Sequence, residues 1–94
     1  MTEQQQRVRL IIHGRVQGVF FRASTMETAL SLGLTGWVRN RPEGTVETVA
    51  EGSAADIERF VEWCHGGPRS ARVDKVEQEH STALGDIVGF EVTY

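Results

Sequence analysis

Hydrophobic and polar residues follow two different periods along this 94-residue chain. The run RVRLIIH at 7–13 is short, apolar and rich in β-branched residues, and Gly14 ends it, which predicts a strand with at least one buried face. The segments 34–40 and 44–52 have the same character, and the RPEG sequence at 41–44 joins them with turn-forming proline and glycine. We therefore expect one strand near the N-terminus and, further along, a β-hairpin.

Two segments show the helical period instead. In 22–32, apolar residues recur at helical spacing and Gly33 follows as a C-terminal stop. The segment 54–65 begins after Ser53, which lies three residues before Asp56 in an N-capping pattern. Its apolar side chains then follow at i, i+3, i+4 and i+7, and these are Ile57, Phe60, Val61 and Cys64. The spacing predicts one helix in each segment.

Two further strand-like runs follow at 71–80 and 86–94, after the breaker GGP. The resulting order is βαββαβ, the ferredoxin-like arrangement of the α+β class, with an additional C-terminal strand. We expect an antiparallel sheet with both helices on one face. The pattern places a single domain at 7–94 behind a flexible polar N-terminus at 1–6.

Charge and cysteine content limit the partners. Ten Lys and Arg against thirteen Asp and Glu give a formal net charge of −3, which opposes binding to a phosphodiester backbone. The single cysteine, Cys64, cannot form an intrachain disulfide, which favours a reducing compartment. The N-terminus lacks the pattern of a signal peptide, and no apolar run approaches the ~20 residues that cross a membrane. We expect a cytoplasmic monomer that binds neither nucleic acid nor membrane.

The sequence GRVQGVFFR at 14–22 connects the first strand to the first helix. Backbone N–H groups in such a loop can converge on an anion, and the start of the helix adds further donors and the positive end of its dipole. Gly14 and Gly18 permit unusual backbone angles, while the Arg22 guanidinium matches two phosphate oxygens. An ordinary connection with its hydrophobic residues packed inward fits the residues equally well. Those residues are Val16, Val19 and Phe20.

Two motifs identify a family. GRVQGVFFR closely resembles the signature loop of the acylphosphatases. The second signature of that family, a Gly-Trp-x-x-Asn strand that ends in a turn before Gly-x-Val, is present as GWVRNRPEGTVE at 36–47. The length, the order of elements and the VAEG sequence before the second helix are also similar to small single-domain acylphosphatases. The resemblance therefore covers essentially the whole chain.

The resemblance implies hydrolysis of an acyl phosphate to a carboxylate and inorganic phosphate. By motif position, Arg22 would hold the phosphoryl group together with the loop amides, and Asn40 would orient the attacking water. The amides in question are those of Arg15, Val16, Gln17, Gly18, Val19 and Phe20. The substrate phosphate would accept the proton, and inorganic phosphate would inhibit competitively. No metal and no cofactor are expected. The departures from the family pattern, at Phe20, Arg41 and Glu43, remove no group with a chemical role.

Several alternatives remain open from the residues alone. His13 adjoins the loop and could act as a general base, although one histidine at a strand end is more often structural. Gln17 could contact the ligand with its side chain or support the turn. A non-catalytic ferredoxin-like module that binds RNA or protein ranks far below the enzyme, since the strands lack an aromatic pair in a basic setting. A related domain that acts on carbamoyl phosphate within a larger maturation machine is a further alternative, but we expect this chain to act without appended domains.

Overall fold

The computed structural model describes residues 4–93 of the chain. The elements are β1 (Gln6–Arg15), α1 (Phe21–Ser31), β2 (Thr35–Asn40), β3 (Val46–Gly52), α2 (Ala54–Gly66), β4 (Arg72–Thr82) and β5 (Phe90–Thr93). Each predicted helix and strand is present, and the helices begin and end within a residue of the predicted bounds. The last strand is much shorter than the predicted 86–94, because Gly85 and Gly89 both adopt positive φ and keep the chain in a loop up to Phe90.

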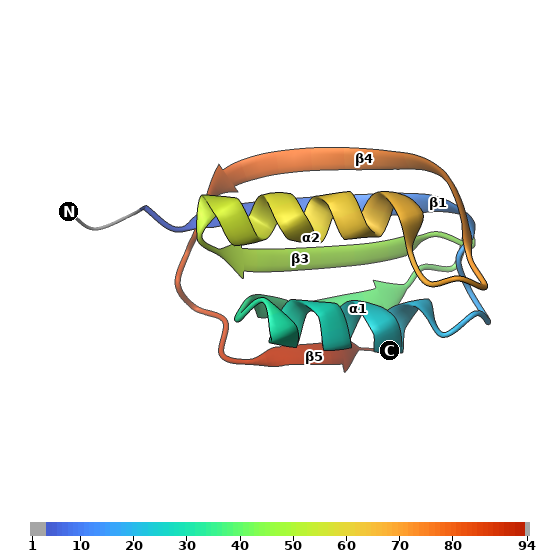
Figure 1. Ribbon diagram of the computed structural model, residues 1–94, viewed down its shortest axis with the longest axis horizontal. Coiled ribbons are helices and arrows are strands. Elements are labelled where there is room, and N and C mark those ends of the chain that lie inside the picture. Colours follow the sequence, from blue (N-terminus) through green and yellow to red (C-terminus); the bar gives the residue numbers. More distant parts are fainter. Residues whose placement is uncertain (1–3, 94) are drawn as a thin grey trace.

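The five strands form one sheet in the order β4-β1-β3-β2-β5, with both helices on one face (Figure 1). The first four strands in this order pair antiparallel, as predicted, but β5 pairs parallel with β2 and makes the sheet mixed. The direction of β5 follows from the way the chain connects it to β4. β4 ends at the end of the sheet where β2 begins, so a short strand that starts there beside β2 runs in the same direction.

The N-terminal boundary differs from the sequence prediction. Gln6, assigned to the flexible segment 1–6, is the first residue of β1 and lies opposite Gly52 on β3 and Thr82 on β4. A residue paired on both sides in a sheet is fixed by the ladder, so the folded domain begins before residue 7. Residues 1–3 lie outside the described residues, and their predicted flexibility stays a prediction.

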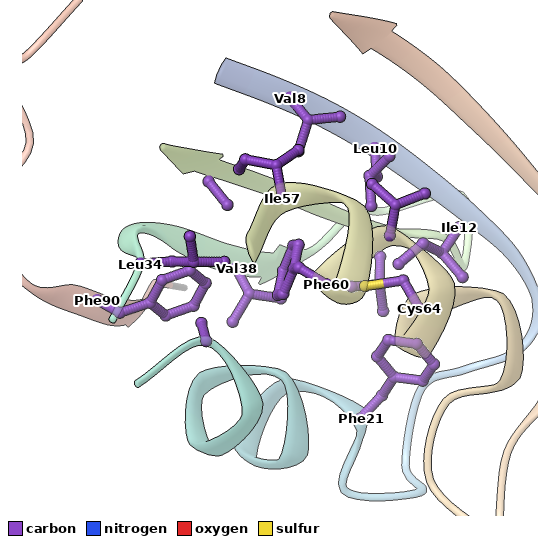
Figure 2. Packing of buried hydrophobic residues seen from close by; sticks show 14 of the residues in the cluster. Val8, Leu10, Ile12, Phe21, Leu34, Val38, Ile57, Phe60, Cys64 and Phe90 are labelled. Atoms are coloured by element: carbon purple, nitrogen blue, oxygen red, sulfur yellow. The ribbon is translucent and has the colours of Figure 1, made fainter. Parts of the chain in front are cut away.

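The core lies between the sheet and the two helices (Figure 2). Val8, Leu10 and Ile12 alternate along β1 and are fully buried beneath the helices. The ring of Phe60 from α2 contacts that of Phe90 from β5, with centroids 6.2 Å apart. Residues of β1 and β5, which lie near opposite ends of the chain, thus belong to the same core. A 94-residue chain has room for only one hydrophobic core.

Cys64 is part of this core and is fully buried, as its place on the apolar stripe of α2 predicts. Burial raises the pKa of its thiol far above the usual range, because the thiolate would lose its hydration. Cys64 therefore packs as a small hydrophobic residue.

The face of the sheet without helices carries charged side chains. The side chain of Glu47 on β3 is only 4% exposed, and its carboxylate accepts hydrogen bonds from Nε of Arg9 (2.6 Å) and Nε of Arg39 (2.7 Å). Burial raises the pKa of Glu47, but the hydrogen bonds and charges of the two arginines outweigh this effect and hold the pKa below its usual value. Three neighbouring strands are thus joined through one carboxylate.

A second buried carboxylate fixes the connection between β4 and β5. Glu51 accepts hydrogen bonds from the backbone N–H groups of Leu84 (3.0 Å) and Gly85 (3.1 Å) and from the guanidinium of Arg7 (2.7 Å). Because the connection is held against the end of β3, the chain crosses the sheet and β5 joins the far edge, beside β2.

Neither helix within residues 4–93 is long and apolar enough to cross a membrane.

Candidate active site

The loop between β1 and α1 curls tightly and is anchored by two valines. Val16 and Val19 are buried in the core, whereas Phe20 is 81% exposed. Gly18 and Phe20 both lie in the left-handed region, with φ of 72° and 63°. The chain therefore turns at these two positions while the valines hold the loop against the core. The inward packing considered from the sequence holds for the valines and is wrong for Phe20.

Gly14 lies at an irregularity of the β1–β4 ladder, with φ of 131°. A Cβ atom at this position would lie only 2.1 Å from the backbone oxygen of Arg72. Glycine is therefore required here by both conformation and space. The strand continues to Arg15, which lies opposite Arg72, so this residue ends β1 and the loop proper begins at Val16.

The helix that follows presents a free N-terminal end. Phe20 is the N-cap residue of α1, makes no side-chain capping hydrogen bond, and accepts the hydrogen bond of Ser24 N–H at its carbonyl (3.0 Å). No acidic side chain lies in the first turn. N–H groups of a first helical turn have no acceptor within the helix, and the helix dipole adds positive potential there. This end of α1 is suited to a negatively charged group.

A cavity of about 330 Å³ lies at this end of the sheet. Its walls come from the loop, the first turn of α1, the end of β2 and the end of β5. The lining residues are Val16, Gly18, Phe20, Phe21, Arg22, Ala23, Asn40 and Val92. The two predicted catalytic residues, Arg22 and Asn40, thus line one cavity although they lie on different elements. Figure 1 shows why β5 participates, since its C-terminal end lies next to the start of α1.

The position of Asn40 follows from strand geometry. Val38 is buried in the core under the helices, and side chains two residues apart on a strand point to the same face. Asn40 therefore points to the helix side at the last residue of β2, where the cavity opens. Its Oδ1 atom is buried and has no hydrogen-bond partner among residues 4–93. A buried acceptor left unpaired costs about 1–3 kcal/mol, so this oxygen is available to accept a hydrogen bond from a molecule in the cavity.

Gln17 connects the loop to the β2–β3 turn. Its side-chain Nε2 donates to the backbone oxygens of Arg41 (2.8 Å) and Thr45 (2.9 Å). Both N–H groups of the amide are used in this way. Of the two alternatives for this side chain, the geometry favours support of the turn.

The other side of the loop is fixed by Ser70, whose Oγ donates to the backbone oxygen of Val19 (2.9 Å). The contribution of Ser70 could not be found from the sequence, because no local pattern marks a serine in an irregular segment as the partner of a distant loop. Val92 was missed for a similar reason, since its place at the cavity depends on the pairing of β5 with β2.

His13 lies away from the cavity. Its Nε2 atom is 2.5 Å from the Glu77 carboxylate on β4, and His13 is not among the residues that line the cavity. The hydrogen bond from His13 lowers the pKa of Glu77. The structure therefore gives the alternative of His13 as a general base no geometric support. Within residues 4–93, no three side chains of His, Cys, Asp or Glu are grouped so that they could hold a metal ion.

These features define a ferredoxin-like α+β domain in which the loop, the first turn of α1 and the end of β2 surround one cavity. Comparison with known proteins then gives the family. The acylphosphatase family model matches residues 8–92, and the chain belongs to the acylphosphatase family. An acylphosphatase of Rubrobacter xylanophilus is 56% identical over 97% of this chain and 83% of its own length.

Solved structures of the same family superpose closely on the chain. The acylphosphatase from Bacillus subtilis matches with a TM-score of 0.91 and 36% identity, over 95% of this chain and 99% of its own. An acylphosphatase from Coxiella burnetii matches with a TM-score of 0.90 and 38% identity, over 99% of this chain and all (100%) of its own. The fold predicted from the sequence is thereby confirmed.

Proposed function

We propose that this protein is an acylphosphatase, which hydrolyses the carboxyl–phosphate bond of small acyl phosphates to a carboxylate and inorganic phosphate. Membership of the acylphosphatase family supports this function. The observation that carries the mechanism is the cavity shared by Arg22 and Asn40, in which Asn40 presents a buried acceptor with no partner among the described residues.

In the proposed complex, the phosphoryl group lies in the loop at the N-terminus of α1. The backbone amides from Arg15 to Phe20 donate to its oxygens, and the Arg22 guanidinium adds a planar, permanently charged donor pair. Anchoring of the loop by Gln17 and Ser70 supports this role, because donors fixed before the substrate arrives need no reorganisation during the reaction.

Asn40 orients the nucleophile. Its Oδ1 accepts a hydrogen bond from a water molecule and holds that water in line with the bond to be broken. The amide does not titrate, so it positions the water without removing a proton from it. The water oxygen bonds to phosphorus as the bond between phosphorus and the acyl oxygen breaks. The carboxylate leaves with the electron pair, and a phosphoryl oxygen accepts the proton of the water.

The reaction requires the protein mainly to position the reactants and to stabilise the negative charge of the transition state. Phosphoryl transfer proceeds through a loose transition state whose charge is spread over the phosphoryl oxygens, so fixed N–H donors and an arginine can supply much of the stabilisation. A carboxylate is a weak base and leaves without prior protonation. The proposed site accordingly requires neither a metal nor a cofactor.

The decisive experiment separates binding from turnover in Asn40→Ala. We expect a folded variant whose affinity for inorganic phosphate, measured by calorimetry, changes less than about tenfold. Its turnover of acetyl phosphate should fall much further, by roughly 10²–10³, a loss of the size caused by removing one group that acts in the transition state. Inorganic phosphate should inhibit the wild-type enzyme competitively.

Arg22→Ala is the matched variant, because it should weaken phosphate binding and turnover together. Thermal unfolding of both variants shows whether either change has instead disturbed the fold. If phosphate affinity and turnover fell in parallel in a fully folded Asn40→Ala protein, Asn40 would be a phosphate ligand and the proposed role in orienting water would be wrong.

A further inference from the structure

Charged residues are distributed unevenly between the two ends of the sheet. Three connections meet at the end that holds the cavity: the loop between β1 and α1, the β2–β3 turn and the connection between α2 and β4 (Figure 1). With the strand and helix ends that flank them, these connections span 14–23, 40–46 and 66–74 and carry five arginines against two carboxylates. The arginines are Arg15, Arg22, Arg41, Arg69 and Arg72, and the carboxylates are Glu43 and Asp74. The cavity end is thus positive on a chain whose formal net charge is −3.

The opposite end of the sheet has the reverse balance. The end of β3, the first turns of α2 and the connection between β4 and β5 carry four carboxylates, which are Glu51, Asp56, Glu58 and Asp86. Two arginines at this end are paired with carboxylates, Arg7 with Glu51 (2.7 Å) and Arg59 with Asp56 (3.1 Å). The electrostatic potential therefore falls along the sheet, from positive beside the cavity to negative at the far end.

Ion pairing within the fold does not explain the arginines beside the cavity. Arg15 and Arg69 form no ion pair with any of residues 4–93. Arg72 pairs with Asp74 (3.1 Å), but both side chains are exposed, and such a pair contributes little to stability. Arg15 moreover lies directly opposite Arg72 in the β1–β4 ladder, where two like charges are unfavourable. This arrangement costs stability, which indicates that the positive charge serves another purpose.

Three of these arginines, Arg15, Arg69 and Arg72, lie beside the cavity without lining it, and we call them the basic rim. The side chains of all three are exposed. Arg15 adjoins Val16 of the cavity lining, and Arg69 adjoins Ser70, which anchors the loop. Charges in such positions act on an anion through the solvent, before it contacts the loop.

We infer that the basic rim attracts acyl phosphates toward the cavity and so lowers their KM, without a part in the chemical step. The inference rests on the proposed function, because it assigns the rim to the substrate of that site. A positive surface around a cleft raises the local concentration of an anion and its rate of association, and both effects weaken as salt screens the charges. The rim also offsets the negative net charge of the chain, which by itself repels the substrate.

The test measures kcat and KM for acetyl phosphate at ionic strengths from about 0.01 to 1 M, where the Debye length falls from roughly 30 to 3 Å. Arg69→Gln and Arg72→Gln, singly and together, remove charge from the rim. Arg59→Gln is the matched control, because it makes the same change in net charge at the far end of the sheet. Asp74→Asn makes the opposite change and leaves the cavity end more positive. Thermal unfolding confirms that each variant is folded.

We expect kcat/KM at the lowest ionic strength to fall about two- to fivefold for each rim arginine removed. Coulomb's law in water gives an effect of this size for a dianion roughly 10 Å from one charge. Asp74→Asn should raise kcat/KM by a similar factor. The changes should lie in KM, with kcat close to the wild-type value, and they should disappear near 1 M salt. Arg59→Gln should stay close to the wild type throughout.

An equal effect in Arg59→Gln would assign the attraction to net charge alone, and a loss that persists at 1 M salt would assign it to direct contact. Either result would overturn the inference, as would a fall in kcat or an unchanged KM in the double variant, and all four would leave the proposed function standing. A wild type that hydrolyses no acetyl phosphate would overturn the proposed function instead. The affinity for inorganic phosphate over the same range of ionic strength would then still decide whether the rim attracts anions.

Discussion

Replacement of Gln17 by leucine tests whether the catalytic geometry depends on the contact between the loop and the β2–β3 turn. Leucine keeps an apolar side chain of comparable size but cannot donate to the backbone oxygens of Arg41 and Thr45. In the proposed mechanism the loop supplies the donors to the phosphoryl group, and the hairpin carries Asn40 at the end of β2. Loss of the contact therefore frees the two halves of the site to move relative to each other.

The structure gives the size of the stability change. Two hydrogen bonds are lost, each with a net contribution of about 0.5–1.5 kcal/mol. Neither carbonyl is left unpaired, since the Arg41 oxygen also accepts from Gly44 N–H (3.0 Å) and the Thr45 oxygen from Arg41 N–H (2.9 Å). We therefore expect the lower part of the range, about 1–2 kcal/mol, which lowers Tm by roughly 4–16 °C in a domain of this size.

The effect on catalysis should exceed the effect on binding. Phosphate affinity, measured by calorimetry, should fall less than kcat, because Ser70 and the buried Val16 and Val19 still anchor the loop, whereas Asn40 loses its fixed position. Ser70→Ala is the matched control, because it removes an anchor of the same loop that does not touch the hairpin. Wild-type kcat in folded Gln17→Leu would refute the reasoning, as would an equal loss of kcat in Ser70→Ala.

Three further predictions follow from the site and the sheet. Arg22→Lys should recover little of the activity lost in Arg22→Ala, because a point charge does not reproduce the guanidinium fork, and near-normal kcat/KM would contradict that geometry. Hydrolysis should persist in a strong chelator, because in the proposed mechanism the loop amides and Arg22 stabilise the charge of the phosphoryl group without a metal ion. Loss of activity that added metal restores would contradict the mechanism. The pKa of Glu47 lies below its ordinary value of 4.5, so its contribution to stability is present above that pH and is lost as the pH falls through the folded-state pKa. Urea unfolding from pH 7 to 3 should therefore show a shallower loss of stability in Glu47→Gln than in the wild type, and parallel curves would be inconsistent with this.

The sequence was sufficient for the order of elements and for the expectation that the loop, Arg22 and Asn40 lie near one another. Hydrophobic periodicity indicates which face of a helix or strand is buried. Two sequence motifs marked Arg22 and Asn40 as parts of one predicted site. Periodicity does not indicate which edge of a sheet a short strand joins. The parallel pairing of β5 with β2 was therefore not predicted, and neither was the place of Val92 at the cavity. The outward ring of Phe20 was also hidden, because a phenylalanine in an apolar run is ordinarily expected in the core.

Cys64 provides an internal probe of how the molecule opens. It is the only thiol in the chain, it is fully buried in α2 against the sheet, and its raised pKa leaves almost no thiolate in the folded state. A thiol reagent can therefore react only when α2 separates from the core, so the labelling rate measures the frequency of that opening. On the proposed function, inorganic phosphate binds only the folded state, so a saturating concentration should slow the labelling. The slower rate would report ligand binding without any change to the protein.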